Sequence, residues 1–317
     1  MDGELYSSDD EFAFADHREW SCSAEEYHAD EALSSTRLKV YLGIDGGGDS
    51  DAAREGTAIH TFALEPEREG SVVRRPNEPQ WLVEMRGKKG VVEARERWAA
   101  DWEAEHSRPG ITVLSPASYE RARRRASALS RFELAKGLPL SKVILRRDAL
   151  VERSSRFVIY GLPGKRRIDL EIPQHVMIDV KSTCAPSVYE FRRDVFRRAY
   201  DMQAAWNVDS GEPLHGRPKT FGFLAVNEAA EVAWIVLPES QIAMGAERYR
   251  SALRLARVHR EMQQMPPSHW SFAGHTLPDP APWERAQVED VAQYARGVEL
   301  WHRRRQQSQR ETEAAAQ

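Results

Sequence analysis

Two aspartates and a lysine within RRIDLEIPQHVMIDVKST, residues 166–183, are spaced so that they could act together. If this stretch is a β-hairpin with Gln174 at the centre of its turn, Asp169 lies opposite Asp179. Side chains that face each other across antiparallel strands are about 5 Å apart at Cβ. Lys181 follows Asp179 by two residues, so it points to the same face of the sheet. The spacing therefore predicts two carboxylates and an ammonium group in one place.

The apolar residues of this stretch favour the same register. It puts three apolar pairs on one face, as a half-buried sheet requires: Ile168 with Val180, Leu170 with Ile178, and Ile172 with Val176. The opposite face then carries the Asp169–Asp179 pair together with the pairs Arg167–Lys181 and Glu171–Met177. The acids and the lysine are thus expected on the polar face of a hairpin.

This arrangement suits metal-assisted hydrolysis of a phosphodiester bond. Facing carboxylates repel each other, and a shared proton or a divalent cation relieves the repulsion. We expect Mg²⁺, with Mn²⁺ as a substitute, to be held by the acids, to polarise the phosphate and to lower the pKa of an attacking water. Lys181 would orient that water and offset negative charge on the phosphate oxygens. On the same reasoning, removing Asp179 would stabilise the metal-free protein. The alternative is a surface hairpin whose basic residues merely neutralise its acids.

The composition is that of a globular protein, with 41% hydrophobic and 30% charged residues among 317. The acidic start and the lack of an apolar run of about 18 residues argue against export and against a membrane span, so a cytoplasmic protein is expected. Two cysteines are too few for a four-thiolate metal site. Residues 1–31 contain eleven acids and one base, which gives them a net charge of −10; since the whole chain carries −4, the remainder carries +6. A mildly basic body is compatible with a polyanionic ligand.

The pattern along the chain predicts an α/β fold with a central mixed β-sheet flanked by helices. Residues 1–31 are expected to be a disordered acidic arm, residues 32–301 a single domain, and residues 302–317 a polar tail. Period-two alternation predicts three strands within 151–183, and a further hairpin is predicted over 221–227 and 231–238. Helices are predicted in 55–66, 91–105, 114–132, 186–206 and 238–262, with Ser34 and Ser115 as N-caps.

Several blocks of the sequence together resemble one known superfamily. In order they are LSSTRLK, GTAIHTFALEPE, GKRRIDLEIP, MIDVKST and YDMQAAW. In this combination the chain resembles the PD-(D/E)xK nucleases, which have a restriction-endonuclease-like core, and among them the exodeoxyribonuclease VIII-like (RecE-type) exonucleases of phage and prophage recombination. The similarity runs from about Leu33 to about residue 265, and residues 42–55 depart from the family pattern.

The resemblance assigns roles to further residues. His60 in GTAIH matches the histidine metal ligand of the family, so the implied metal ligands are His60, Asp169 and Asp179. Tyr200 and Gln203 match the YxxQ motif, and their spacing places both on one helix face. Gln203 is expected to bind Lys181 or a DNA phosphate. Glu152 and Arg167 are further candidates, ranked below the others.

The resemblance also implies an activity, which composition and spacing do not. It implies a Mg²⁺-dependent 5′→3′ exonuclease that acts on linear duplex DNA, forms a ring-like homo-oligomer and works with a single-strand annealing recombinase. Two alternatives stay open: a related RecB/Cas4-type nuclease module, and a non-catalytic protein that uses the same fold to bind DNA or a partner. Basic clusters at Arg121, Arg123–Arg125, Arg192, Arg193, Arg197 and Arg198 could contact DNA phosphates or could be solvated helix faces.

Overall fold

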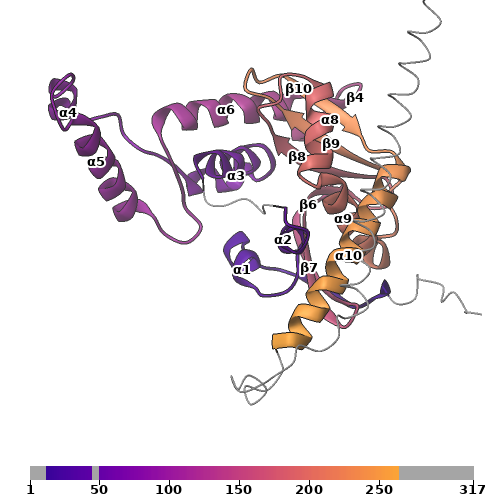
Figure 1. Ribbon diagram of the computed structural model, residues 1–317. Helices are drawn as coiled ribbons and strands as arrows, with labels where there is room; N and C mark the ends of the chain where they lie inside the picture. Colours follow the sequence, from indigo (N-terminus) through magenta and orange to yellow (C-terminus); the bar gives the residue numbers. More distant parts are fainter. Residues whose placement is uncertain (1–11, 45–49, 264–317) are drawn as a thin grey trace, which may run out of the picture. The chain divides into compact units, whose positions relative to one another are not determined.

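The computed structural model describes residues 12–44 and 50–263 (Figure 1). The first compact unit of the chain ends at Glu261. The predicted tail, residues 302–317, and the part of the predicted domain beyond residue 263 lie outside the described residues, as do residues 1–11 of the predicted arm.

A six-stranded sheet forms the centre of this unit, in the order β1-β6-β7-β8-β9-β10. Its strands are β1 (Phe14–Trp20), β6 (Leu150–Ile159), β7 (Leu162–Ile172), β8 (Val176–Ser182), β9 (Thr220–Val226) and β10 (Val232–Val236). Only β8 and β9 run parallel, and the other neighbours are antiparallel. The predicted central mixed sheet is therefore present. Two small sheets pair β2 (Val72–Arg74) with β3 (Thr112–Leu114), and β4 (Glu133–Ala135) with β5 (Leu138–Pro139).

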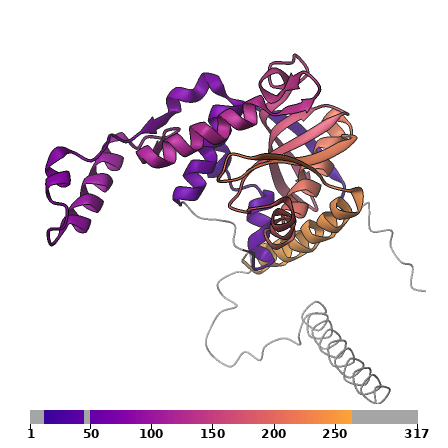
Figure 2. The same cartoon turned by 90° about the horizontal axis from the view of Figure 1, so that it is seen from above.

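Helices cover both faces of the sheet. The helices in the described residues are α1 (Ala24–Ala29), α2 (Ser35–Tyr41), α3 (Asp51–Leu64), α4 (Gln80–Glu84), α5 (Val91–His106), α6 (Pro116–Arg131), α7 (Leu140–Val143), α8 (Val188–Arg197), α9 (Tyr200–His215) and α10 (Glu239–Gln263), with a 3-10 helix at Pro66–Ser71. One apolar cluster joins the sheet to α8, α9 and α10, and a second joins it to α3, α6 and α7 (Figure 1). Figure 2 shows the same layers from above, with α10 in orange along one side of the sheet.

Serine caps begin the two helices for which they were predicted. Ser34 accepts a hydrogen bond from the backbone N–H of Arg37 at the start of α2, and Ser115 does the same for Ser118 in α6. The helix predicted over 186–206 is instead two helices. Ala199, with φ of 50°, interrupts it, and the second helix continues to His215. This break sets the direction in which α9 presents its first turn.

The prediction of an arm over residues 1–31 is wrong for the part that the structure describes. Phe14–Trp20 is an edge strand paired with β6, and Ala24–Ala29 is a helix with a Ser23–Glu26 capping box. The acidic composition of the segment did not indicate this order, because the β1 acids Asp16 and Glu19 are exposed while Phe14 packs against the core. Charge composition describes the solvent face of a segment, whereas a few aromatic side chains decide whether it is ordered.

The hairpin register is as predicted near the turn. Leu170 pairs with Ile178 and Ile172 with Val176, and Gln174 takes the left-handed conformation with φ of 61°. The backbone pairing of β7 with β8 stops at Leu170–Ile178, so Asp169 and Asp179 are not a ladder pair.

One predicted face assignment needs correction. Ile168 packs into the cluster of α9, whereas Leu170 and Ile172 pack into the cluster of α3. Side chains of β7 thus change faces around Asp169. The cause lies on the neighbouring strand, where Glu152, with φ of 49°, interrupts the pairing of β6 with β7 between the 151–170 and 153–168 pairs. This irregularity turns Asp169 and Glu152 toward α3.

Candidate active site

The site lies where β7 and β8 separate beyond the Leu170–Ile178 pair. Two side chains form hydrogen bonds with the backbone of Val180, which lies beyond the end of the β7–β8 ladder. Its N–H donates to Asp169 Oδ2 at 2.6 Å, and its carbonyl accepts from His60 Nε2 at 3.0 Å. The helix that carries His60 approaches β8 closely, because a Cβ at Gly56 would lie 3.3 Å from Ser182 Oγ. The glycine of GTAIH therefore lets α3 bring its histidine to the hairpin, 120 residues away in the sequence.

His60, Glu152 and Asp169 form one group of possible metal ligands. Their donor atoms all lie within 4.8 Å of one another. His60 Nδ1 is 3.4 Å from Glu152 Oε1 and 3.7 Å from Asp169 Oδ1. The other Glu152 oxygen accepts from Arg167 Nε at 2.8 Å, which fixes the carboxylate. Glu152, ranked low from sequence, thus shares the centre of the site with Asp169, and Arg167 holds Glu152 rather than facing Lys181.

Asp179, Lys181 and Gln203 form a second group. Lys181 Nζ is 2.5 Å from Asp179 Oδ2, and Gln203 donates from Nε2 to Asp179 Oδ1 at 2.8 Å. Lys181 Nζ also donates to Gln203 Oε1 at 3.3 Å and lies 4.9 Å from the centre of the Tyr200 ring. Gln203 therefore holds the lysine, one of the two roles expected for it.

The group of possible metal ligands differs from the expected set of His60, Asp169 and Asp179. Within the described chain, the group that could hold a metal ion contains Glu152 in place of Asp179. The physical reason is charge: the side chain of Lys181 is only 15% exposed, and Asp179 is the carboxylate paired with it. An ammonium group out of water needs such a counter-ion.

The two groups shift one another's protonation. Burial lowers the pKa of His60, but Asp169 and Glu152 outweigh it and raise that pKa to about 9. Burial raises the pKa of Asp169 to about 7, against the opposing effect of His60. Burial opposes the charge of Lys181, yet Asp179 raises its pKa to about 12. The metal-free site therefore holds protons that a cation would displace, and Lys181 stays an ammonium group.

The sequence interpretation missed a second buried lysine. Lys39, in the LSSTRLK block, is 7% exposed, and its Nζ lies 5.1 Å from the centre of the Tyr200 ring. Burial, and then the charge of Lys181, lower its pKa to about 8. Its position between α2 and α9 depends on tertiary contacts, and the only sequence signal was its membership of that block.

A cavity of about 360 Å³ opens beside these groups. His60, Glu152, Arg167 and Asp169 line it. Small and hydroxyl-bearing side chains contribute much of the remaining wall: Ser35, Thr36, Ala52, Ala53, Gly56, Thr57 and Ser182. The possible metal ligands thus face a space that a substrate can enter.

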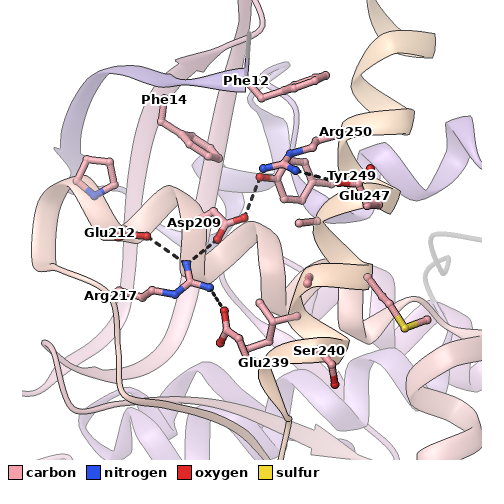
Figure 3. A pocket seen from close by; sticks show the side chains of 15 residues that line it. Phe12, Phe14, Asp209, Glu212, Arg217, Glu239, Ser240, Glu247, Tyr249 and Arg250 are labelled. Carbon is pink, nitrogen blue, oxygen red and sulfur yellow. Dashed lines mark hydrogen bonds and ion pairs between the residues drawn. The ribbon is translucent and has the colours of Figure 1, made fainter. Parts of the chain in front are cut away.

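A larger hollow of about 730 Å³ lies elsewhere, between the end of α9 and the start of α10 (Figure 3). Arg217 occupies its wall and is held by three carboxylates, those of Asp209, Glu212 and Glu239. Tyr249 donates from its hydroxyl to Asp209 Oδ2 at 2.8 Å. These groups pair with one another, so the wall of the hollow is a structural ion-pair network.

Arg121 and Arg123–Arg125 on α6 also bind partners within the fold. Arg121 and Arg125 both bind the buried Glu55, Arg123 pairs with Glu69, and Arg124 donates to the backbone carbonyl of Glu228. On α8, Arg193, Arg197 and Arg198 have acidic partners on their own helix. The α6 cluster is therefore explained by its packing and needs no nucleic acid.

Replacing Asp179 with alanine should destabilise the metal-free protein by about 3–5 kcal/mol, because it leaves the Lys181 ammonium group, whose side chain is only 15% exposed, without its counter-ion. This reverses the stabilisation expected from relieved repulsion between aspartates. Thermal melting in the presence of a chelator measures the effect. Asp148→Ala, which removes an exposed partner of Arg146, serves as the control and should leave the melting temperature nearly unchanged. An unchanged or higher melting temperature for Asp179→Ala would contradict the pairing.

Among the described residues, no helix has both the length and the apolar character needed to cross a membrane. Comparison of the sequence with protein-family models and with curated proteins finds no match. Among solved structures, the chain is similar to a protein of Eubacterium rectale described as a "putative exonuclease". The two share 12% sequence identity with a TM-score of 0.44, over 84% of this chain and 98% of that one. A likeness at this level carries no argument about activity, which must come from the site itself.

Proposed function

We propose that the protein is a Mg²⁺-dependent nuclease of the PD-(D/E)xK type that hydrolyses phosphodiester bonds in DNA. The observation that carries this proposal is the placement of His60, Glu152 and Asp169 beside the Lys181–Asp179 pair. Carboxylate oxygens are the ligands that Mg²⁺ prefers, and a cation beside them suits an anionic substrate.

The residues present fit a divalent cation. The carbonyl of Val180 accepts the Nε2–H of His60, which leaves Nδ1 facing the two carboxylates. A backbone acceptor on one ring nitrogen is the usual way to orient a histidine ligand. His60 Nδ1, Glu152 and Asp169 would hold Mg²⁺. The bound ion supplies a Lewis acid for the phosphate and a more acidic water.

Lys181, Gln203 and Arg167 have the remaining roles. Lys181, kept charged by Asp179, donates to the attacking water or a phosphate oxygen and offsets the negative charge that develops there. Its raised pKa makes it an electrostatic group rather than a general base. Gln203 binds both members of the pair and so fixes the position of Nζ. Arg167 keeps Glu152 turned toward His60.

Glu152→Gln should weaken Mg²⁺ binding by at least about 10-fold, by analogy with the 10–100-fold cost of disturbing the shell around a metal. Isothermal titration of the protein with Mg²⁺, in the absence of DNA, measures the affinity. Glu93→Gln on α5, where the carboxylate is exposed, is the matched control. Equal Mg²⁺ affinity in Glu152→Gln and wild type would remove Glu152 from the ligand set.

We further propose that the enzyme is a 5′→3′ exonuclease on linear duplex DNA, with Mn²⁺ able to replace Mg²⁺, and that it forms a homo-oligomer and works with a single-strand annealing recombinase. The support is the resemblance of the sequence blocks around His60, Asp169, Lys181 and Gln203 to RecE-type exonucleases.

Duplexes labelled at either the 5′ or the 3′ end test the polarity, with covalently closed circles as the control. Early release of the 5′ label and intact circles are expected. Cleaved circles would show an endonuclease, and early release of the 3′ label would reverse the polarity. Light scattering tests the oligomer.

A further inference from the structure

Asn207 is a buried polar residue with an unused side chain in the wall of the cavity. It lies on α9 four residues after Gln203 and therefore on the same helix face. It is 4% exposed, and its carboxamide makes no hydrogen bond with any described residue, although its backbone carbonyl accepts from Arg166 Nη1 at 2.8 Å. The polar atoms of the carboxamide are not sealed from solvent, so they can donate to and accept from a ligand that enters the cavity.

Tyr27 lines the same cavity from α1, in the segment that charge composition had suggested was an arm. Lys165 fixes it, since Nζ donates to the Tyr27 backbone carbonyl and lies 4.5 Å from the ring centre. The Tyr27 hydroxyl forms no hydrogen bond within the described chain. Burial raises the pKa of Tyr27, so the hydroxyl is a neutral group that can both donate and accept.

We infer that Tyr27 and Asn207 form a nucleoside subsite that holds the sugar and base of the nucleotide whose phosphate reaches His60, Glu152 and Asp169. Both groups are uncharged donors and acceptors, which match the neutral polar edges of a nucleoside rather than a phosphate. Arg167 lines the same cavity together with His60, Glu152 and Asp169, and these residues suit a phosphate and its cation.

The size of the cavity agrees with this assignment. At about 360 Å³ it is at the lower end of the volumes that hold small ligands. A volume of this size suits a single nucleotide better than a duplex. This inference rests on the proposed nuclease function for its choice of substrate, but the binding of a mononucleotide can be measured without any cleavage.

The test compares binding of deoxynucleoside 5′-monophosphates and inorganic phosphate by calorimetry, with the full chain and Ca²⁺ in place of Mg²⁺. Wild type should bind the mononucleotides more tightly than phosphate. Asn207→Ala and Tyr27→Phe should each weaken mononucleotide binding by about 10-fold, the effect of one lost hydrogen bond, and leave phosphate binding unchanged. Tyr27→Phe removes only a hydroxyl and so keeps the packing. Asn77→Ala, at an exposed asparagine, is the matched control.

DNA cleavage adds a second readout, in which both variants should raise KM about 10-fold with little change in kcat. Wild-type cleavage together with unaltered mononucleotide binding in both variants would overturn the subsite and leave the nuclease intact. An equal loss of mononucleotide and phosphate binding would also overturn it. Selective loss of mononucleotide binding, in a protein that cleaves no DNA, would support the subsite and refute the proposed nuclease.

Discussion

Replacing Lys181 with methionine should lower the maximal rate of DNA cleavage by about 10²–10³-fold, the usual loss when one preorganised electrostatic group is removed from a transition state. The ammonium group sits between Asp179 Oδ2 and Gln203 Oε1, so its position is fixed before substrate arrives. Methionine retains most of the apolar volume of the side chain. The rate is measured at saturating DNA and Mg²⁺, so that weaker binding of either does not contribute.

Two controls make this result specific. Lys142→Met removes an exposed lysine of α7 and should leave the rate unchanged. Thermal melting of Lys181→Met identifies the fraction folded, because the change leaves Asp179 buried without its partner. A folded Lys181→Met protein that cleaves within a few-fold of wild type would refute the role assigned to the lysine.

The stability of the metal-free protein should fall as pH rises from about 6.5 to about 8; above that, Lys39, whose pKa is lowered to about 8, adds stability as pH rises and opposes the change. His60 has a folded-state pKa of about 9 against 6.5 for the free side chain, so its stabilising contribution is complete below 6.5 and is lost as pH rises through 9. A shift of this size corresponds to about 3 kcal/mol. Asp169, whose pKa is raised to about 7, contributes in the same direction but loses its contribution at lower pH, between 3.8 and 7.

Mg²⁺ should abolish most of this pH dependence, because the cation takes the place of the proton on His60. Its apparent affinity should rise up to about 10-fold per pH unit below pH 9, as expected where binding displaces one proton. Melting curves from pH 6.5 to 8, with chelator or excess Mg²⁺, measure both effects, and His60→Gln should remove the pH dependence in this range. A metal-free stability that is constant or increases over this range would contradict the assigned protonation.

The hairpin could be predicted because its alternation is strict. Leu170, Ile172, Val176 and Ile178 permit one register that packs all four against one cluster, and the structure has that register. Ile168 was misassigned because alternation assumes an unbroken strand, and the left-handed backbone at Glu152 breaks it. A positive φ at a glutamate has no sequence signature.

Sequence spacing also fails where two residues meet only through the tertiary fold. Glu152 and His60 are 92 positions apart, and nothing in the sequence places the one beside the other. From the sequence alone, Arg121 and Arg125 could contact DNA. In the structure both bind Glu55, which is 66 residues from Arg121 and 70 from Arg125. Gln203 was predicted from the match to the YxxQ motif, and helix spacing then places Asn207, four residues further on, on the same face.

Cleavage of linear duplex DNA by the wild type and by Asp169→Asn, each with Mg²⁺ and with EDTA, tests the central claim most directly. Asparagine keeps an oxygen that can accept the Val180 N–H but removes the charge that would hold the cation. The proposal predicts cleavage by the wild type with Mg²⁺, none with EDTA, and almost none by Asp169→Asn in either condition. Equal cleavage by the two proteins, or cleavage by the wild type that persists in EDTA, would contradict a metal-dependent nuclease centred on Asp169.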